Sequence, residues 1–233
     1  MNLLSLDTST EFLSLALQLG DKIYAHYQHA GQAASQLVLP QIQALLDAAN
    51  VKLSELDGIA FGAGPGAFTG VRVACGVAQG LGFGANLPVV GVNTLMALAQ
   101  VSGHERVIAC LDARMGEIYH AAFLRQNGKW IEQSSTTVCK PEASPVLEGE
   151  WVGVGSGWAV YGEILSKIYA QNLSQVLVHD LYSKVTPTAE AILQLALPIF
   201  VAGEAKPASE AVPIYIRNRV ALTSQEREQG IRL

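Results

Sequence analysis

Charged residues are scarce in this sequence: they make up 15% of its 233 residues, whereas soluble domains average about a quarter. Half of the residues are hydrophobic, so an unusually large share of the surface must be hidden in a core or against a partner. The net charge is −5, which argues against a protein that grips nucleic acid by itself, because neutralising phosphates takes clustered Lys and Arg. Any nucleic acid would be held mainly by a partner protein.

Cysteine is rare as well. The three cysteines, Cys75, Cys110 and Cys139, are widely spaced in apolar surroundings, which is typical of reduced core residues in a cytosolic protein. The five histidines lack the spacing that places two metal ligands on one helix face. We therefore expect a cytoplasmic protein with no metal site of its own.

Long hydrophobic runs are missing too. The longest stretch of low charge, at 60–86, is interrupted by Arg72, Gln79 and many glycines, whereas a membrane-spanning helix needs about 20 predominantly apolar residues. The N-terminus enters a strand pattern directly, without the basic segment that opens a signal peptide. We expect neither a membrane span nor a signal peptide.

What is present is a regular alternation of strand and helix patterns. The opening predicts a three-stranded meander, and a helix follows at 33–49, where Pro40 should kink or restart it. Further expected elements are a strand at 58–61, a helix at 69–85, a strand at 89–92 and a helix at 94–101. This alternation predicts an α/β sheet.

The second half begins like the first. An apolar strand at 107–111 ends at Asp112, as the first strand ends at Asp7, and a turn and two further strand patterns follow each. The repeat indicates a duplication, with an N-terminal lobe at 1–101, a C-terminal lobe at 102–222 and a polar tail at 223–233. The last helix is expected at 187–202, with Thr186 as its N-cap and Pro187 in its first turn.

A glycine-rich loop at 62–66 leads into the helix pattern at 69–85. Gly62, Gly64 and Ala67 fit a dinucleotide-binding fingerprint between a strand and a helix. Pro65, however, removes one N–H group from the loop, and no acidic residue follows the next strand to hold a ribose. We expect no nicotinamide or flavin site, and no cofactor bound by this chain alone.

The helix patterns at 33–49 and 69–85 are apolar over a wider arc than a helix needs to cover one face of a sheet. Gly76, Gly80 and Gly84 share one helix face, although each glycine costs about 0.5–1 kcal/mol relative to alanine in a helix. Two helices from a second chain could cover this surface as a four-helix bundle; alternatively, C-terminal helices of the same chain cover it. The predicted partner interface consists of Leu37, Val38, Gln41, Leu45, Arg72, Val73, Gly76, Val77 and Gly80.

Two meanders, each followed by α/β units, resemble the duplicated ribonuclease-H-like fold of actin, sugar kinases and Hsp70 chaperones, here with a degenerate second lobe. Motifs along nearly the whole chain are similar, in the same order, to those of the TsaB family, which is also known as YeaZ. They are LDTST (6–10), GAGPGAFTGVR (62–72), VNTLMALAQ (92–100), DARMGEIY (112–119), VGSGW (154–158) and PIYIRN (213–218).

The resemblance implies a role in making N6-threonylcarbamoyladenosine at position 37 of tRNAs that read ANN codons. The chain would be a non-catalytic scaffold subunit, not an enzyme by itself, paired with the related catalytic protein TsaD and joined by the ATPase TsaE. The resemblance also implies homodimers when the partner is missing, tRNA contact mainly through the complex, and ATP and Mg²⁺ only at the level of the complex.

In the superfamily the turn after the first strand of each lobe faces a cleft that binds ATP and Mg²⁺. The resemblance therefore implies that Asp7, Thr8, Asp112 and Arg114 face this cleft. An aspartate in such a turn often only accepts backbone N–H bonds, however. The sequence leaves open whether Arg114 and Glu117 form a local ion pair or face the cleft.

Catalytic TsaD-type proteins carry a metal-binding His-x-x-x-His on the first helix, and the matching stretch here, 32–40, contains no histidine. Ala34 stands where TsaB-like proteins often have a single histidine. The competing hypothesis is an independent ATPase or small-molecule kinase of the actin-like class. Such an enzyme needs a phosphate loop in each lobe, a catalytic acid and an adenosine pocket, and VGSGW is the only candidate loop in the second lobe.

Overall fold

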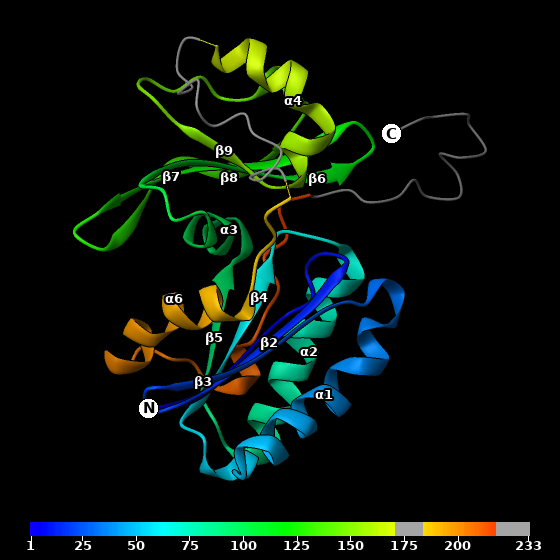
Figure 1. Cartoon of the computed structure of the whole chain (residues 1–233), viewed down its shortest axis with the longest axis vertical. Helices are drawn as coiled ribbons and strands as arrows, with labels where there is room; N and C mark the ends of the chain where they lie inside the picture. The colour runs from blue at the N-terminus through cyan, green and yellow to red at the C-terminus, as the bar shows by residue number, and fades with distance from the viewer. Residues whose placement is uncertain (171–183, 218–233) are drawn as a thin grey trace.

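The chain forms two sheets, stacked end to end (Figure 1). The computed structural model describes residues 1–170 and 184–217. The first sheet has five strands in the order β3-β2-β1-β4-β5, and the second has four in the order β8-β7-β6-β9. Each sheet joins an antiparallel meander to parallel strands, so the duplicated α/β fold expected from the sequence is confirmed.

Helices cover both faces of the first sheet. Its meander is β1 (Asn2–Asp7), β2 (Phe12–Leu19) and β3 (Lys22–His29), and the parallel strands are β4 (Gly58–Gly64) and β5 (Val89–Asn93). On one face, α1 (Ala34–Ala49) and α2 (Phe68–Ala85) pack on Leu4 and Leu6. On the other, α6 (Ala189–Val201) packs on Leu3 and Ala60. Because side chains alternate along a strand, β1 is buried on both faces.

The second sheet is a reduced copy of the first. It consists of β6 (Arg106–Arg114), β7 (Glu117–Gln126), β8 (Lys129–Cys139) and β9 (Val152–Val154). The helix α4 (Ser156–Tyr169) follows β9 as α2 follows β4, but the place of α1 is taken by the short η3 (Pro141–Ala143). α3 (Thr94–Ser102) lies between the sheets and packs on the second through Leu95 and Leu98.

One prediction about a helix end is wrong. α6 begins at Ala189, with Thr188 and not Thr186 as its N-cap; the Thr188 side chain accepts a bond from Ala191 N at 3.3 Å. The Thr186 hydroxyl is hydrogen-bonded instead to the hydroxyl of Tyr27, at 2.6 Å. The restart expected at Pro40 does not occur, since α1 is continuous from Ala34 to Ala49; Pro40 is exposed, so water can bond the carbonyl group that loses its N–H partner. The kink expected at Pro40 stays a prediction.

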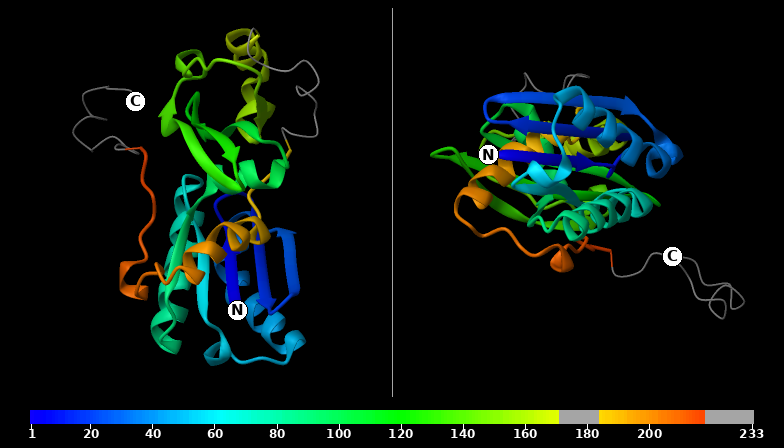
Figure 2. Two further views of the ribbon diagram at one scale, coloured as in Figure 1. Left: turned by 90° about the vertical axis from the view of Figure 1, so that its left-hand side faces the viewer. Right: turned by 90° about the horizontal axis from the view of Figure 1, so that it is seen from below.

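After α6 the described chain returns along the outside of the first lobe and reaches the second lobe at Arg217 (Figure 2). It passes through η4 (Ala208–Glu210), and Ile214 N donates to the carbonyl oxygen of Ala63 at 2.7 Å. Arg217 then bonds to Glu117 in the second lobe. The structure thus places 189–214 with the first sheet, and the lobe boundaries drawn from the sequence stay a prediction. No helix in the described ranges is both long and apolar enough to cross a membrane.

Candidate functional site

The glycine-rich loop before α2 is filled by the chain's own first turn. A Cβ atom at Gly66 would lie 2.4 Å from the carbonyl oxygen of Ser9, and one at Gly70 would lie 1.8 Å from that of Thr8. Ala67 N donates to the Ser9 carbonyl oxygen at 2.7 Å. The glycines therefore allow the turn between β1 and β2 to approach the start of α2, and the N–H group of Ala67 is already used.

Asp7 and Thr8 are both engaged within the chain. Asp7 Oδ1 accepts bonds from Ser9 N at 3.0 Å and from Ser9 Oγ at 2.8 Å. Asp7 Oδ2 is buried and has no partner among the described residues, and burial raises the pKa of this carboxyl to about 6. Thr8 Oγ1 donates to the Gly70 carbonyl oxygen at 2.6 Å. These bonds hold the first turn in place.

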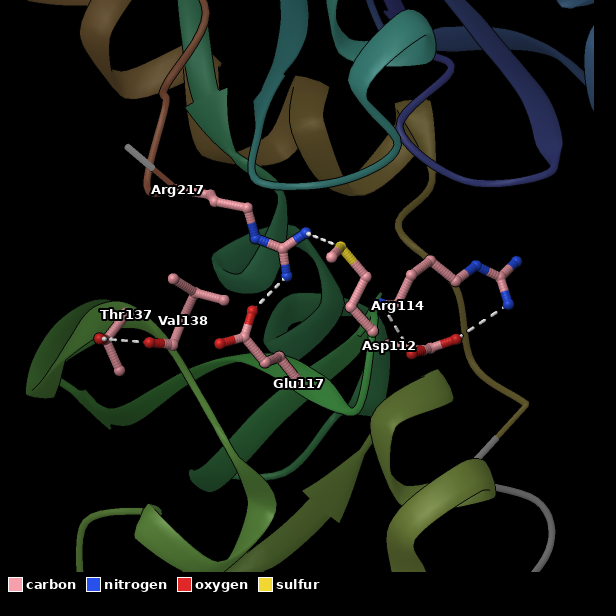
Figure 3. A network of polar contacts seen from close by, with 7 residues as sticks. Asp112, Arg114, Glu117, Thr137, Val138 and Arg217 are labelled. Carbon is pink, nitrogen blue, oxygen red and sulfur yellow. Dashed lines mark hydrogen bonds and ion pairs between the residues drawn. The ribbon is translucent and has the colours of Figure 1, made fainter. Parts of the chain in front are cut away.

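Asp112 ends β6 in the same way. Its Oδ1 accepts a bond from Arg114 N at 2.9 Å, and its Oδ2 lies 3.0 Å from Arg114 Nη1 (Figure 3). Glu117 bonds instead to Arg217. Arg114 and Glu117, between which the sequence left an ion pair open, take other partners: Arg114 pairs with Asp112, and Glu117 joins residues 211–217 to the second lobe through Arg217. Within 1–170 and 184–217, no three His, Cys, Asp or Glu residues are placed to hold a metal ion.

α1 and α2 lie side by side on the outside of the first lobe (Figure 1). α2 turns Val71, Ala74 and Ala78 to the core. Of the predicted interface residues, Val38 and Leu45 are buried inside the chain. Leu37, Gln41, Val73 and Val77 are partly exposed, and Arg72, Gly76 and Gly80 are exposed.

Among the described residues, no neighbour explains the three glycines on the outer face of α2. Cβ atoms at Gly76, Gly80 and Gly84 would meet nothing within 4 Å in the described chain, whereas one at Gly82 would touch Ala208 at 3.0 Å. α6 packs on the opposite face of the sheet, so among the described helices none covers these glycines. Each glycine lowers the stability of the helix relative to alanine, and no contact within the described chain offsets this loss. The three glycines therefore form a flat strip on α2 that is open to another chain.

The α1–α2 surface is also poor in charge. Each helix carries one charged residue, Asp47 on α1 and Arg72 on α2. Large hydrophobic side chains are exposed on both helices: Leu39 is 51% exposed and Phe83 is 77% exposed. Depletion of charge with exposed apolar side chains is typical of a surface that another protein covers.

Known proteins are similar to this chain over most of its length. The family model of TsaD, tRNA N6-adenosine threonylcarbamoyltransferase, matches residues 26–223. The tRNA threonylcarbamoyladenosine biosynthesis protein TsaB of Escherichia coli is 38% identical over 230 residues, covering 95% of this chain and 96% of the relative. The chain belongs to the TsaB family. The Haemophilus influenzae TsaB is 37% identical, covering 94% and 95% of the two chains.

Solved structures agree with membership of the TsaB family. YeaZ from Pseudomonas aeruginosa superposes with a TM-score of 0.80 at 41% identity, covering 92% of this chain and 99% of that one. A second structure, an uncharacterized protein with similarity to peptidase YeaZ from the same organism, gives 0.83 at 40% identity, covering 93% and 99%. The family resemblance and the ribonuclease-H-like fold inferred from the motifs are therefore confirmed.

The contacts of Arg72 on the α2 surface of this TsaB-family chain were not predicted from the sequence. Arg72 Nε donates to the hydroxyl oxygen of Tyr215 at 2.8 Å, and the guanidinium carbon lies 3.3 Å from the centre of the Phe68 ring. Phe68 lies one helical turn before Arg72 and could have been found from that spacing. Tyr215 belongs to the motif at 213–218, but no local pattern links that motif to α2.

Proposed function

We propose that this chain is a non-catalytic subunit of the cytoplasmic machinery that makes N6-threonylcarbamoyladenosine at position 37 of ANN-decoding tRNAs. It holds and activates a TsaD-like catalytic subunit by pairing with it through α1 and α2, and a TsaE-like ATPase joins the pair. tRNA is bound mainly by the complex. Alone, the chain pairs with a second copy through the same helices.

The observation that carries this proposal is the open glycine strip of α2. Gly76, Gly80 and Gly84 are spaced so that a partner helix can approach the backbone closely, and nothing in the described chain does so. The relatives' names and the TsaD family model support the pathway. A catalytic role is not favoured, because Asp7 and Asp112 are used within their own turns.

The test places a large side chain on the strip. Gly80→Arg should reduce binding to the TsaD-family subunit of the same organism by more than about a hundredfold, since a bulky residue prevents close backbone contact. It should leave the chain folded, because the new side chain points into open space. Gly162→Arg is the matched control, since Gly162 is a helical glycine of α4 whose Cβ would also meet nothing within 4 Å.

Binding is measured by calorimetry, and threonylcarbamoyl transfer to tRNA is measured with the purified subunits. Unchanged affinity of Gly80→Arg would show that the partner binds elsewhere. ATP hydrolysis or metabolite phosphorylation by the chain alone would support the competing ATPase or kinase hypothesis instead.

A further inference from the structure

The guanidinium group of Arg72 lies over the ring of Phe68 and beside Tyr215 at the start of α2, and we call these three residues the Phe68–Arg72–Tyr215 clamp. The guanidinium carbon lies 3.3 Å from the ring centre of Phe68 and 5.3 Å from that of Tyr215, and Arg72 Nε donates to the Tyr215 hydroxyl oxygen. The two rings remain 47% and 54% exposed. The clamp therefore fixes a cation at the surface without burying it.

The clamp is held from two directions. Phe68 and Arg72 are one turn apart on α2, so the helix sets their contact. Tyr215 is fixed on both sides, by the bond from Ile214 N to Ala63 at 2.7 Å and by the contact of Arg217 with Glu117. An arginine held in this way loses little conformational entropy when a ligand binds to it.

One edge of the guanidinium group has no partner within 1–170 and 184–217. An arginine has five N–H donors, and in the described part of the chain the hydrogen bond of Arg72 is the one from Nε to Tyr215. Asp47, the single acidic residue of α1 and α2, is hydrogen-bonded to Gln43 at 2.8 Å. The terminal nitrogens Nη1 and Nη2 are thus available for an acceptor from outside.

We infer that the catalytic partner presents a carboxylate to the open edge of Arg72, which makes the Phe68–Arg72–Tyr215 clamp the charged anchor of the interface. This inference rests on the proposed function. A planar guanidinium edge matches a carboxylate through two parallel bonds, and arginine with exposed aromatic residues is the composition of interface hot spots. A phosphate is less suited, because nucleic acid needs several cations and α2 offers one.

Two substitutions test the anchor. Arg72→Met keeps the aliphatic stem and removes the charge, so it should weaken binding to the TsaD-family subunit by about tenfold or more. Tyr215→Phe keeps the ring and removes the bond to Nε, so it should weaken binding by about threefold to tenfold. Added NaCl should weaken the wild-type complex, and this salt dependence should be smaller for Arg72→Met.

Arg106→Met is the matched control. Arg106 likewise lies over an aromatic ring, 4.7 Å from the centre of Trp151, and among the described residues its side chain makes one hydrogen bond, to the Glu148 carbonyl oxygen at 2.9 Å. It belongs to the second lobe, so its replacement should leave affinity and salt dependence unchanged. Thermal unfolding of each variant checks that the chain remains folded.

The inference is overturned if Arg72→Met binds the TsaD-family subunit with unchanged affinity and salt dependence. It is also overturned if only tRNA binding by the complex weakens, which would assign the edge to a phosphate, or if only self-association weakens, which would assign it to a second copy. Gly80→Arg distinguishes a failure of the proposed α1–α2 interface from a failure of the Arg72 anchor alone. If it abolishes binding while Arg72→Met does not change it, the proposed interface stands and the anchor fails.

Discussion

The carboxylate of Asp7 lies directly against the backbone of Gly62: a Cβ atom at Gly62 would come 1.9 Å from Asp7 Oδ2. In this position Oδ2 is out of reach of water and has no donor among the described residues. The first residue of the supposed phosphate loop therefore serves to make room for a buried acid. Such an acid destabilises the fold when it is ionised.

Replacement of Asp7 by asparagine should stabilise the protein at about pH 8. Burial raises the carboxyl pKa from 3.8 to about 6, so the unfolded chain loses its proton first and stability falls as the pH rises through this range. The full penalty above it is about 3 kcal/mol. Because the new amide group also lacks a partner at every pH, we expect Asp7→Asn to gain about 1–2 kcal/mol at pH 8 and to lose about 1 kcal/mol near pH 4, where the carboxyl group is no longer ionised in the folded protein.

Urea unfolding at several pH values measures this gain. Asp112→Asn is the control, since the equivalent carboxylate of the second lobe already has Arg114 beside it and no such gain is expected. Loss of stability in Asp7→Asn at high pH would mean that the fold needs the negative charge.

His120 should stay neutral in the folded protein at about pH 5. Its Nε2 lies 2.9 Å from the hydroxyl of Tyr169, which donates to the Pro145 carbonyl oxygen at 2.7 Å. Nε2 must therefore carry the proton, and Nδ1 is buried without a partner among the described residues. Burial lowers the pKa from 6.5 to about 4. Stability is therefore lost as the pH falls through this interval, by about 3 kcal/mol.

Nitrogen NMR of the imidazole ring tests this directly. We expect the signals of the Nε2–H tautomer to persist as the pH is lowered to about 5, while the same residue in urea becomes protonated near its ordinary pKa. A folded-state signal of the charged ring at that pH would contradict the assignment. Because Asp7 and His120 act in opposite directions over the same interval, Asp7→Asn should also steepen the acid sensitivity of the protein.

Much of the fold was predictable because its signals are local. The alternating and helical hydrophobic patterns gave the strands and helices, and the aspartates at the ends of β1 and β6 marked the duplication. The N-cap of α6 was misplaced, because Thr186-Pro187 and Thr188 offer competing signals two residues apart and only the packed position of Ala189 decides between them.

Of the candidate interface on α1 and α2, the sequence predicted only the part that follows from the helical spacing of its residues. The apolar arc of α1 does not say which part faces the sheet, and Val38 and Leu45 are buried within the chain. The glycines of the loop and of α2 look alike in the sequence. What distinguishes Gly70 from Gly76 is a contact with Thr8, far away along the chain. Tyr215 reaches Arg72 across 143 residues, a relationship that no periodicity can show.

Substitution of alanine at Gly76 and at Gly70 should have opposite effects on the stability of the chain. Gly76→Ala should stabilise the isolated chain by about 0.5–1 kcal/mol, because alanine is the better helix former and its methyl group meets open space. Gly70→Ala should destabilise it by about 2 kcal/mol or more, since the methyl group would displace the first turn. Urea unfolding at concentrations where the chain is monomeric measures both. Destabilisation by Gly76→Ala would show that part of the chain covers the strip.

The link between Arg217 and Glu117 should couple the C-terminal segment to the second lobe. The two side chains are 14% and 32% exposed, between a surface pair and a buried one, so we expect a coupling free energy of about 1–2 kcal/mol. A double-mutant cycle of Arg217→Met and Glu117→Gln isolates it, because both changes remove the charge and keep most of the side chain.

Hydrogen exchange gives the cycle a structural readout. In Arg217→Met the amide of Ile214 should exchange faster. Ile214 lies three residues before Arg217 in the same extended segment, and its N–H group is hydrogen-bonded to Ala63. The amides inside α6 should keep their protection, since that helix is held by its own apolar face on the first sheet. Additive single-mutant effects together with unchanged exchange at Ile214 would mean that the ion pair forms without tying the lobes together. The C-terminal segment would then be held by its contacts to β4 and α2 alone.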